Sequence, residues 1–255
     1  QAVHFHRAEE LYLNQEFTEA ENYFKASLKF NPDKKLEGEA WYWLGEIAYK
    51  AGKYSDATTN YNRFINISEG SNSPLFANCY YNIGYCYYME KNYSQALNFY
   101  KKFKDVSSYV PSNSERYLDN ILRLGDCYFL SGQYEKAAES YGFVSSKKTV
   151  SSDYATFQQG IIYGLLDKRD LKIATLRNIP QYYPKSGYTD DAIYELGAEY
   201  LEDENYATAE SFFRKLLTEH PLSIHVANAY LKLGLLYYNN KREKEAIASY
   251  QEVIK

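Results

Sequence analysis

The sequence of 255 residues contains little proline or glycine, 6 and 13 residues respectively, and only three cysteines. This small number of proline and glycine residues argues against a loop-rich fold. An odd cysteine count without a C-x-x-C motif excludes a complete disulfide framework. No apolar run approaches the roughly 20 residues that a membrane-spanning helix needs, so direct membrane insertion is not expected. The net charge of −4 does not favour nucleic acid or an acidic membrane surface.

Catalytic and metal-binding signatures are also missing. We find no Gly-rich phosphate loop, nucleophile elbow or H-E-x-x-H motif, so neither an enzyme nor a cofactor is expected. The four histidines form two pairs, in HFH and HPLSIH, whose spacing does not bring ligands to one point as a metal site requires. We interpret Cys79, Cys86 and Cys127 as buried small hydrophobic residues.

What the chain does contain is a repeat. A small residue recurs at intervals of 35 to 41 residues, at Ala8, Gly45, Gly84, Gly125, Gly160, Gly197 and Gly234. Mostly large residues stand four and one positions before it and three after it, as Tyr80, Ile83 and Tyr87 do around Gly84. This spacing places them on one stripe of an amphipathic helix.

A second helix follows each of these after a polar turn such as KAGKY or LSGQY. Twelve residues beyond the small residue stands an alanine, at Ala20, Ala57, Ala96, Ala137, Ala209 and Ala246. Four residues further stands an aromatic ring, at Phe24, Tyr61, Tyr100, Tyr141, Phe213 and Tyr250. Small residues allow two helix backbones to approach closely, and Pro32, Pro184 and Pro221 are expected to end the second helix.

The motif W-x-x-L-G-x-x-A at residues 41–48, followed by Ala57, Tyr61 and Phe64, resembles a tetratricopeptide repeat, and the resemblance covers the whole chain. It implies an all-α fold, a right-handed α-solenoid (superhelix) of about seven antiparallel helix hairpins in a single domain, 1–255. The expected units are 1–34, 38–71, 77–110, 118–151, 153–186, 190–223 and 227–255.

Two units depart from the pattern. The fifth unit has Lys172 in place of the alanine and Pro180 inside its second helix, which predicts degenerate packing or a bend. The last unit is incomplete and has no polar capping helix, so oligomerisation through this end is expected to be possible. We read the opening QAVHFHRAEE as a processed or trimmed start.

The resemblance also implies which residues face a concave groove. In this family the second, fifth, sixth, ninth, twelfth and thirteenth places of each unit do so, whereas Trp41 belongs to the core. The resulting partner-binding candidates are Tyr12, Tyr42, Trp43, Glu46, Tyr49, Tyr81, Tyr85, Tyr88, Asp126, Phe129, Tyr154, Phe157, Tyr194 and Tyr238. The alternative for any one tyrosine is that it braces adjacent repeats.

Acidic residues outnumber basic ones at the same places. The acidic ones are Glu9, Glu39, Glu46, Asp119, Asp126, Asp191, Glu195 and Glu202, against Lys50, Arg123 and Lys232. An acidic surface lined by tyrosine suits a neutral or basic extended peptide, because a cation can contact both carboxylates and aromatic faces. A solvated acidic face is the alternative.

The predicted function is therefore a non-catalytic scaffold that binds a peptide or protein segment. A glycan-binding surface and a docking module of a larger enzyme are the alternatives. Residues 183–223 resemble repeats of bacterial cell-envelope proteins, which favours a periplasmic or cell-envelope location over a cytoplasmic one.

Overall fold

The structure is a computed structural model that describes residues 1–30, 33–68, 73, 75–106, 111–112 and 114–254. These residues form fourteen α-helices and no strand, which confirms the predicted all-α helical repeat. The helices are α1 (Ala2–Leu13), α2 (Phe17–Ser27), α3 (Lys34–Lys50), α4 (Tyr54–Ile67), α5 (Leu75–Met89), α6 (Tyr93–Val106), α7 (Glu115–Leu130), α8 (Tyr134–Ser145), α9 (Ser152–Leu165), α10 (Arg169–Tyr182), α11 (Thr189–Glu202), α12 (Tyr206–Glu219), α13 (Val226–Asn239) and α14 (Glu243–Val253).

The chain divides into two compact units, Gln1–Gln133 and Tyr134–Lys255. The first contains α1 to α7 and the second α8 to α14, so the division falls between the two helices of the fourth predicted repeat.

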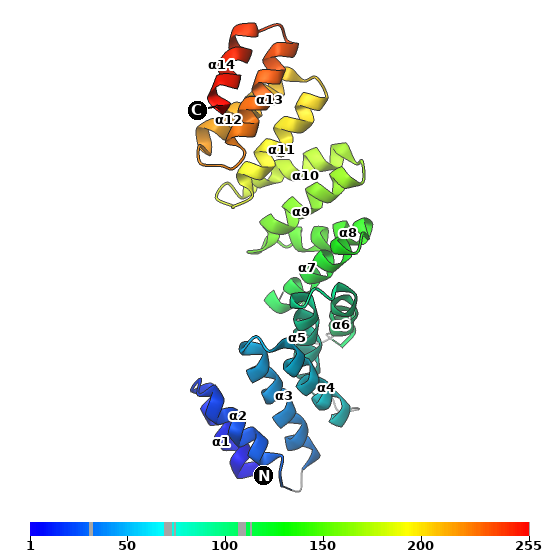
Figure 1. Cartoon of the computed structure of the whole chain (residues 1–255). Helices are drawn as coiled ribbons and strands as arrows, with labels where there is room; N and C mark the ends of the chain where they lie inside the picture. Colours follow the sequence, from blue (N-terminus) through cyan, green and yellow to red (C-terminus); the bar gives the residue numbers. More distant parts are fainter. Residues whose placement is uncertain (31–32, 69–72, 74, 107–110, 113, 255) are drawn as a thin grey trace. The chain divides into compact units, whose positions relative to one another are not determined.

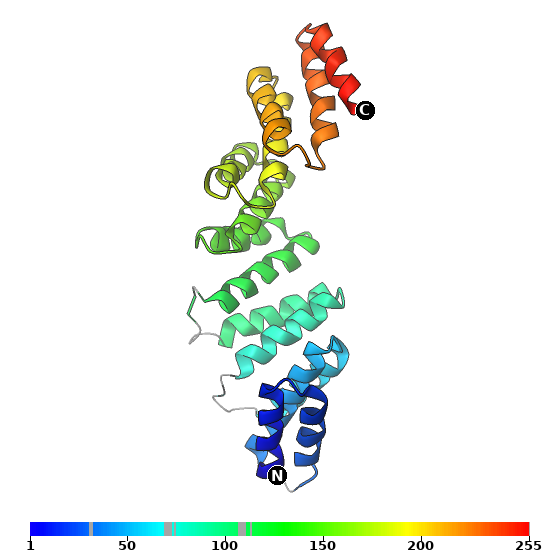
Figure 2. The same cartoon turned by 90° about the vertical axis from the view of Figure 1, so that its left-hand side faces the viewer.

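In the first unit, consecutive helices form antiparallel hairpins, α1 with α2, α3 with α4 and α5 with α6 (Figures 1 and 2). Its apolar core lies between hairpins as well as within them. Phe24 of α2 shares a cluster with Leu44 of α3, and Phe64 of α4 shares another with Ile83 of α5. Each hairpin is apolar on two sides and buries them only by contact with a neighbour, as the repeat predicts.

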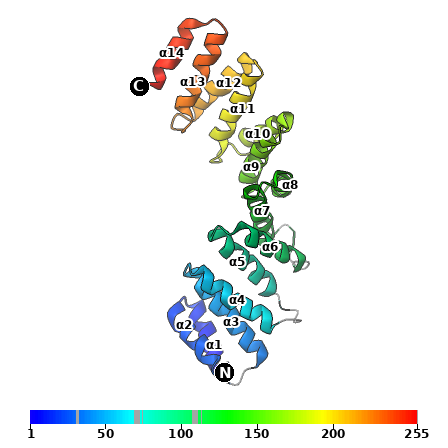
Figure 3. The same cartoon turned by 45° about the vertical axis from the view of Figure 1, so that its right-hand side comes forward.

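In the second unit, α8 packs against α9, and the hairpins are α9 with α10, α11 with α12 and α13 with α14 (Figure 3). Leu176 of α10 shares a buried cluster with Leu196 of α11. Phe213 of α12 shares the next with Leu236 of α13. The core of this unit is therefore also continuous from one hairpin to the next.

The aromatic ring of the second helix packs against the small residue of the first helix. A Cβ added to Gly45 would lie 2.6 Å from ring carbons of Tyr61, and one added to Gly84 would lie 2.8 Å from those of Tyr100. Both rings are fully buried, as are the alanines one turn earlier on the same helices. The spacing of sixteen residues between glycine and ring thus corresponds to a direct contact across the hairpin.

A left-handed residue follows the first helix of each of the seven repeats. The N–H that follows it donates to the carbonyl five residues earlier, as Lys53 does to Ala48 at 2.9 Å, which is the Schellman arrangement. Glycine is favoured in this conformation, yet five of the seven residues carry side chains. The seven left-handed residues have φ between 56° and 71°. They are Gln15, Gly52, Lys91, Gly132, Asp167, Glu204 and Lys241.

The prolines behave as expected where the structure describes them. The helices α10 and α12 end at Tyr182 and Glu219, two residues before Pro184 and Pro221. Pro32 lies outside the described residues.

The fifth repeat is packed, and its second helix is not broken. Pro180 lies in the last turn of α10, which runs without a break to Tyr182. The aliphatic part of Lys172 lies against Gly164 of α9. Its ammonium contacts two carboxylates of α11, Glu195 at 2.7 Å and Glu199 at 2.5 Å. A charged contact to the next hairpin therefore stands where the other repeats have alanine.

We predict that Gly45→Ala lowers the free energy of unfolding by about 1–3 kcal/mol, because the buried Tyr61 ring cannot move away without disturbing its own contacts. Gly187→Ala is the matched control, since nothing lies within 4 Å of the Cβ that it would add. Urea unfolding of both variants measures the difference. Equal stabilities would show that the hairpin tolerates a wider separation.

The ion pairs of Lys172 predict that the stability of the fold depends on pH. After the opposing effect of burial, hydrogen bonds and charge from Lys172 and Arg169 leave the pKa of Glu199 below its usual 4.5. A lowered pKa stabilises the fold above pH 4.5, and this stabilisation is lost as the pH falls through the folded-state pKa. The free energy of unfolding of Glu199→Gln should therefore be about 1–2 kcal/mol lower than that of the wild type at pH 7. The size of this loss reflects the side chains of Lys172 and Glu199, which are mostly but not completely buried.

Urea unfolding at pH 7 and below pH 4.5 tests this, and the gap between wild type and Glu199→Gln should narrow at the lower pH. Glu219→Gln is the control, because Glu219 forms an exposed pair with Lys215 at 3.9 Å. A gap that does not change with pH would contradict the assignment.

Candidate protein-interaction surface

Aromatic residues of the first helices in the first unit lie where those helices meet. The rings of Tyr12 on α1 and Trp43 on α3 are 4.7 Å apart, and those of Tyr49 on α3 and Tyr85 on α5 are 5.6 Å apart. All four side chains are partly buried. They therefore brace adjacent repeats and still present part of their surface to solvent.

The contact between α5 and α7 adds charge to this arrangement. The hydroxyl of Tyr81 donates to the carboxylate of Asp119. The ring of Tyr88 lies beneath the guanidinium of Arg123, 5.8 Å from it. Arg123 also contacts Asp126 at 2.8 Å and Asp119 at 3.4 Å. One arginine thus pairs with two carboxylates and covers an aromatic ring of the preceding repeat.

Two predicted surface residues are buried instead. Tyr42 is 5% exposed, because it points between α3 and α4, where its ring lies 6.0 Å from that of Tyr61 and 5.8 Å from that of Phe64. Phe5, in the same place of the first repeat, is 1% exposed. Asp126 is 4% exposed beneath its ion pair with Arg123. The repeat position of Phe5 and Tyr42 and the carboxylate of Asp126 thus belong to the interior.

The other candidates of the first unit, which we call the aromatic face, are partly buried. They are Tyr12, Trp43, Glu46, Tyr49, Tyr81, Tyr85, Tyr88 and Phe129.

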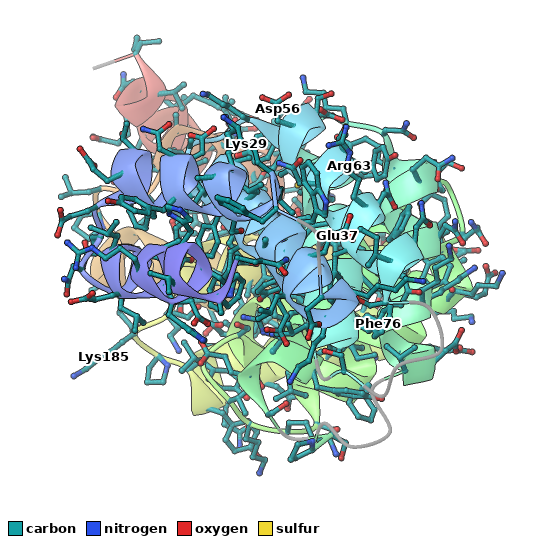
Figure 4. The ribbon with its side chains drawn as sticks, turned by 90° about the horizontal axis from the view of Figure 1, so that it is seen from below. Lys29, Glu37, Asp56, Arg63, Phe76 and Lys185 are labelled. Atoms are coloured by element: carbon teal, nitrogen blue, oxygen red, sulfur yellow. The ribbon has the colours of Figure 1, made fainter. Side chains whose placement is uncertain are left out.

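Trp41, predicted to lie in the core, is only partly buried. Its ring contacts two buried clusters, and the guanidinium of Arg63 lies over it at 4.1 Å. Together they border a pocket of about 340 Å³ that α2, α3 and α4 line, with Glu21, Lys25 and Asp56 among its residues. Figure 4 labels Asp56 and Arg63 on α4. Sequence patterning did not predict this pocket, because its wall combines residues of two repeats.

In the second unit, the predicted residues differ in their contacts and in how exposed they are. The ring of Phe157 stacks on that of Tyr188 at 5.3 Å, and Tyr154 lies 5.6 Å from the same ring. Tyr194 stacks on His225 at 4.5 Å. Tyr238 is 67% exposed, so it is the most accessible aromatic candidate of this unit.

Most of the predicted acidic residues have a basic partner within the chain. The partners, within 4.0 Å, are His6 for Glu9, Lys35 for Glu39, Arg123 for Asp119 and Asp126, His225 for Asp191, and Lys172 for Glu195. Among the described residues none lies that close to Glu46 or Glu202. The lysine and arginine partners therefore make the surface less acidic than the count of carboxylates suggests.

Glu46 lies at the centre of a polar network. Its carboxylate accepts hydrogen bonds from the Tyr61 hydroxyl at 2.7 Å and from the Asn82 amide at 2.6 Å. Burial, and next the charge of Glu46, raise the pKa of Tyr12 to about 12. The same two causes raise the pKa of Tyr61. Glu46 is thus a structurally fixed anion within the aromatic face.

The cysteines are chemically quiet in this environment. All three are buried and unpaired, which confirms their interpretation as small core residues. Burial is the main cause that raises the pKa of Cys86 and of Cys127 to about 12, which keeps both thiols protonated.

Among the described residues, no group of three or more His, Cys, Asp or Glu side chains is arranged to hold a metal ion. No helix in the same residues combines the length and apolar character needed to cross a membrane.

Comparison with known families agrees with this geometry. Tetratricopeptide repeat models match residues 36–103 and also residues 119–142 and 228–255. The matched segments are therefore tetratricopeptide repeats. The first match covers α3 to α6, which carry Trp43, Glu46 and most of the aromatic face, so this surface is built on typical repeats of the family.

Two relatives are considerably longer proteins. Response regulator aspartate phosphatase J of Bacillus subtilis (strain 168) is 24% identical over 146 residues, 56% of this chain and 39% of that protein. Tetratricopeptide repeat protein 29 of Macaca fascicularis is 31% identical over 117 residues, 44% of this chain and 24% of that protein. The chain therefore spans two fifths and one quarter of their lengths.

Solved structures confirm the fold. The C-terminal part of a repeat-containing protein of Cytophaga hutchinsonii superposes with a TM-score of 0.74 at 14% identity, covering 98% of this chain and 94% of that one. The MamA protein gives 0.59 at 22% identity, covering 71% and 92%. At these identities the likeness establishes the fold alone.

We predict that the pair of rings between α3 and α5 contributes to stability. Tyr49→Ala and Tyr85→Ala should each destabilise the protein, and their double-mutant cycle should give a coupling of about 0.5–1.5 kcal/mol, as aromatic pairs do. Urea unfolding of the four proteins measures it. Additive losses would mean that the rings do not brace the repeats.

Proposed function

We propose that this tetratricopeptide repeat protein is a non-catalytic scaffold that binds a protein or peptide segment along its first helices. The observation that supports the proposal is the aromatic face, whose rings are fixed by contacts between repeats yet partly open to solvent. Fixed Tyr and Trp side chains bind with little further loss of conformational freedom. Arrays of this kind use their extended repeat surface for binding.

The chemistry of the surface favours a neutral or basic segment. Among the described residues, Glu46 and Glu202 have no basic side chain within 4.0 Å, and aromatic faces add attraction for cations. A polyanion such as nucleic acid does not fit a surface of this sign. The cell envelope is the location that we favour, on the resemblance of residues 183–223.

A second candidate is a docking module of a larger enzyme. It is favoured by the greater length of the relatives, one of which is a phosphatase. A repeat fold does not by itself carry such an activity to this chain.

Photo-crosslinking from defined positions tests the scaffold. Tyr85→p-benzoylphenylalanine on α5 and Tyr238→p-benzoylphenylalanine on α13 should capture a partner from cell extracts. The matched controls lie on second helices, Tyr23 of α2 at 38% exposure and Leu171 of α10 at 47%. We expect capture from the first-helix positions and little from the controls, because only the former lie on the proposed surface.

Equal capture from all four positions would place the interface elsewhere. Retention of polysaccharide without protein capture would favour the glycan-binding alternative.

A further inference from the structure

The first unit contains the same arrangement of residues twice, with one difference. Between α5 and α7, Arg123 lies over the ring of Tyr88 and pairs with Asp119 and Asp126. Here a guanidinium occupies a place made by one ring from the preceding repeat and two carboxylates of its own helix.

The equivalent positions, two repeats earlier in the chain, lie on α1 and α3. Counted from the small residue of each first helix, Tyr88 corresponds to Tyr12, Asp119 to Glu39, Asp126 to Glu46 and Arg123 to Trp43. The ring and both carboxylates are retained, and an aromatic ring replaces the arginine. The guanidinium that pairs with both α7 carboxylates therefore has no counterpart at the equivalent position of α3.

The charges around Glu46 do not supply one. Lys50 lies one turn further along α3, and its ammonium is directed over the Phe17 ring, 5.7 Å from the centroid. Lys35 reaches Glu39 at 4.0 Å and is largely exposed. The Tyr61 hydroxyl and the Asn82 amide donate to Glu46 and orient its carboxylate without neutralising it. The arrangement thus has an oriented anion beside partly exposed rings.

We propose that Glu46, with Tyr12 and Trp43, binds the guanidinium of an arginine side chain supplied by the partner. This inference rests on the proposed function, because it identifies the residue that the scaffold recognises. Arginine fits better than lysine, since a planar guanidinium stacks on aromatic rings while it donates to a carboxylate. The chain itself fills the equivalent place beside Asp126 with arginine.

The test is an NMR titration with an acetylated and amidated Gly-Ser-Arg-Ser-Gly peptide. The matched peptide has citrulline, which keeps the shape of arginine without its charge. The arginine peptide should shift the Trp43 indole N–H and the backbone amides of Tyr12 and Glu46. It should bind about tenfold more tightly than the citrulline peptide, the selectivity that a charge-assisted hydrogen bond gives.

Two variants locate the effect. Glu46→Gln keeps an acceptor for Tyr61 and Asn82 and should remove most of the selectivity. Trp43→Arg should place a guanidinium beside Glu46, as Arg123 lies beside Asp126, and should abolish binding of the peptide. Glu37→Gln is the control, because Glu37 lies in the first turn of the same helix and belongs to no part of this arrangement (Figure 4).

Equal binding of the two peptides, or an unchanged preference in Glu46→Gln, would overturn the inference. If Trp43→Arg fails to fold, Glu46→Gln still decides the question. The titration requires no natural partner, so its failure would leave the crosslinking test of the scaffold unaffected. Conversely, selective binding without crosslinking would support the arginine site and place the rest of the interface away from Tyr85 and Tyr238.

Discussion

The structure depends on the close approach of two helices at a residue without a side chain. Where Gly45 and Gly84 face the rings of Tyr61 and Tyr100, an added methyl group would overlap the ring. The contact fixes the separation of the two helices in a hairpin, and this separation fixes which residues of the first helix reach the next hairpin. Burial of Phe24 against Leu44, and of Phe64 against Ile83, follows from the same spacing. A change in the helix separation of one hairpin would therefore alter its contacts with the neighbouring hairpins.

The rings of the first helices brace successive repeats and also suit the binding role that we propose for them. Tyr12 with Trp43 and Tyr49 with Tyr85 join successive repeats, so these rings are already ordered before any partner arrives. Ordered rings lose little conformational entropy on binding, which makes a bracing residue a suitable binding residue as well. The two explanations that the sequence leaves open for these tyrosines are thus compatible.

Electrostatic contacts vary from repeat to repeat, whereas the backbone pattern is constant. Lys172 replaces a buried alanine, yet its repeat remains packed because Glu195 and Glu199 of the next helix balance the ammonium. Arg123 performs a comparable role for Asp119 and Asp126. Glu46 occupies the place of Asp126 without such a partner, and the proposed arginine site rests on this difference.

The sequence alone determined the repeat, its helices and the row of small residues against buried rings, because glycine and aromatic positions recur with the helical period. Burial of the three cysteines followed from the same periodicity. The turns were only partly predictable, since five left-handed positions carry residues such as Lys91 and Asp167 in place of glycine. Only the tertiary structure decided that Tyr42 is buried while Trp41 borders a pocket, and that Glu46 differs from Asp126. These properties arise from side chains of neighbouring repeats, and a pattern within one repeat does not contain that information.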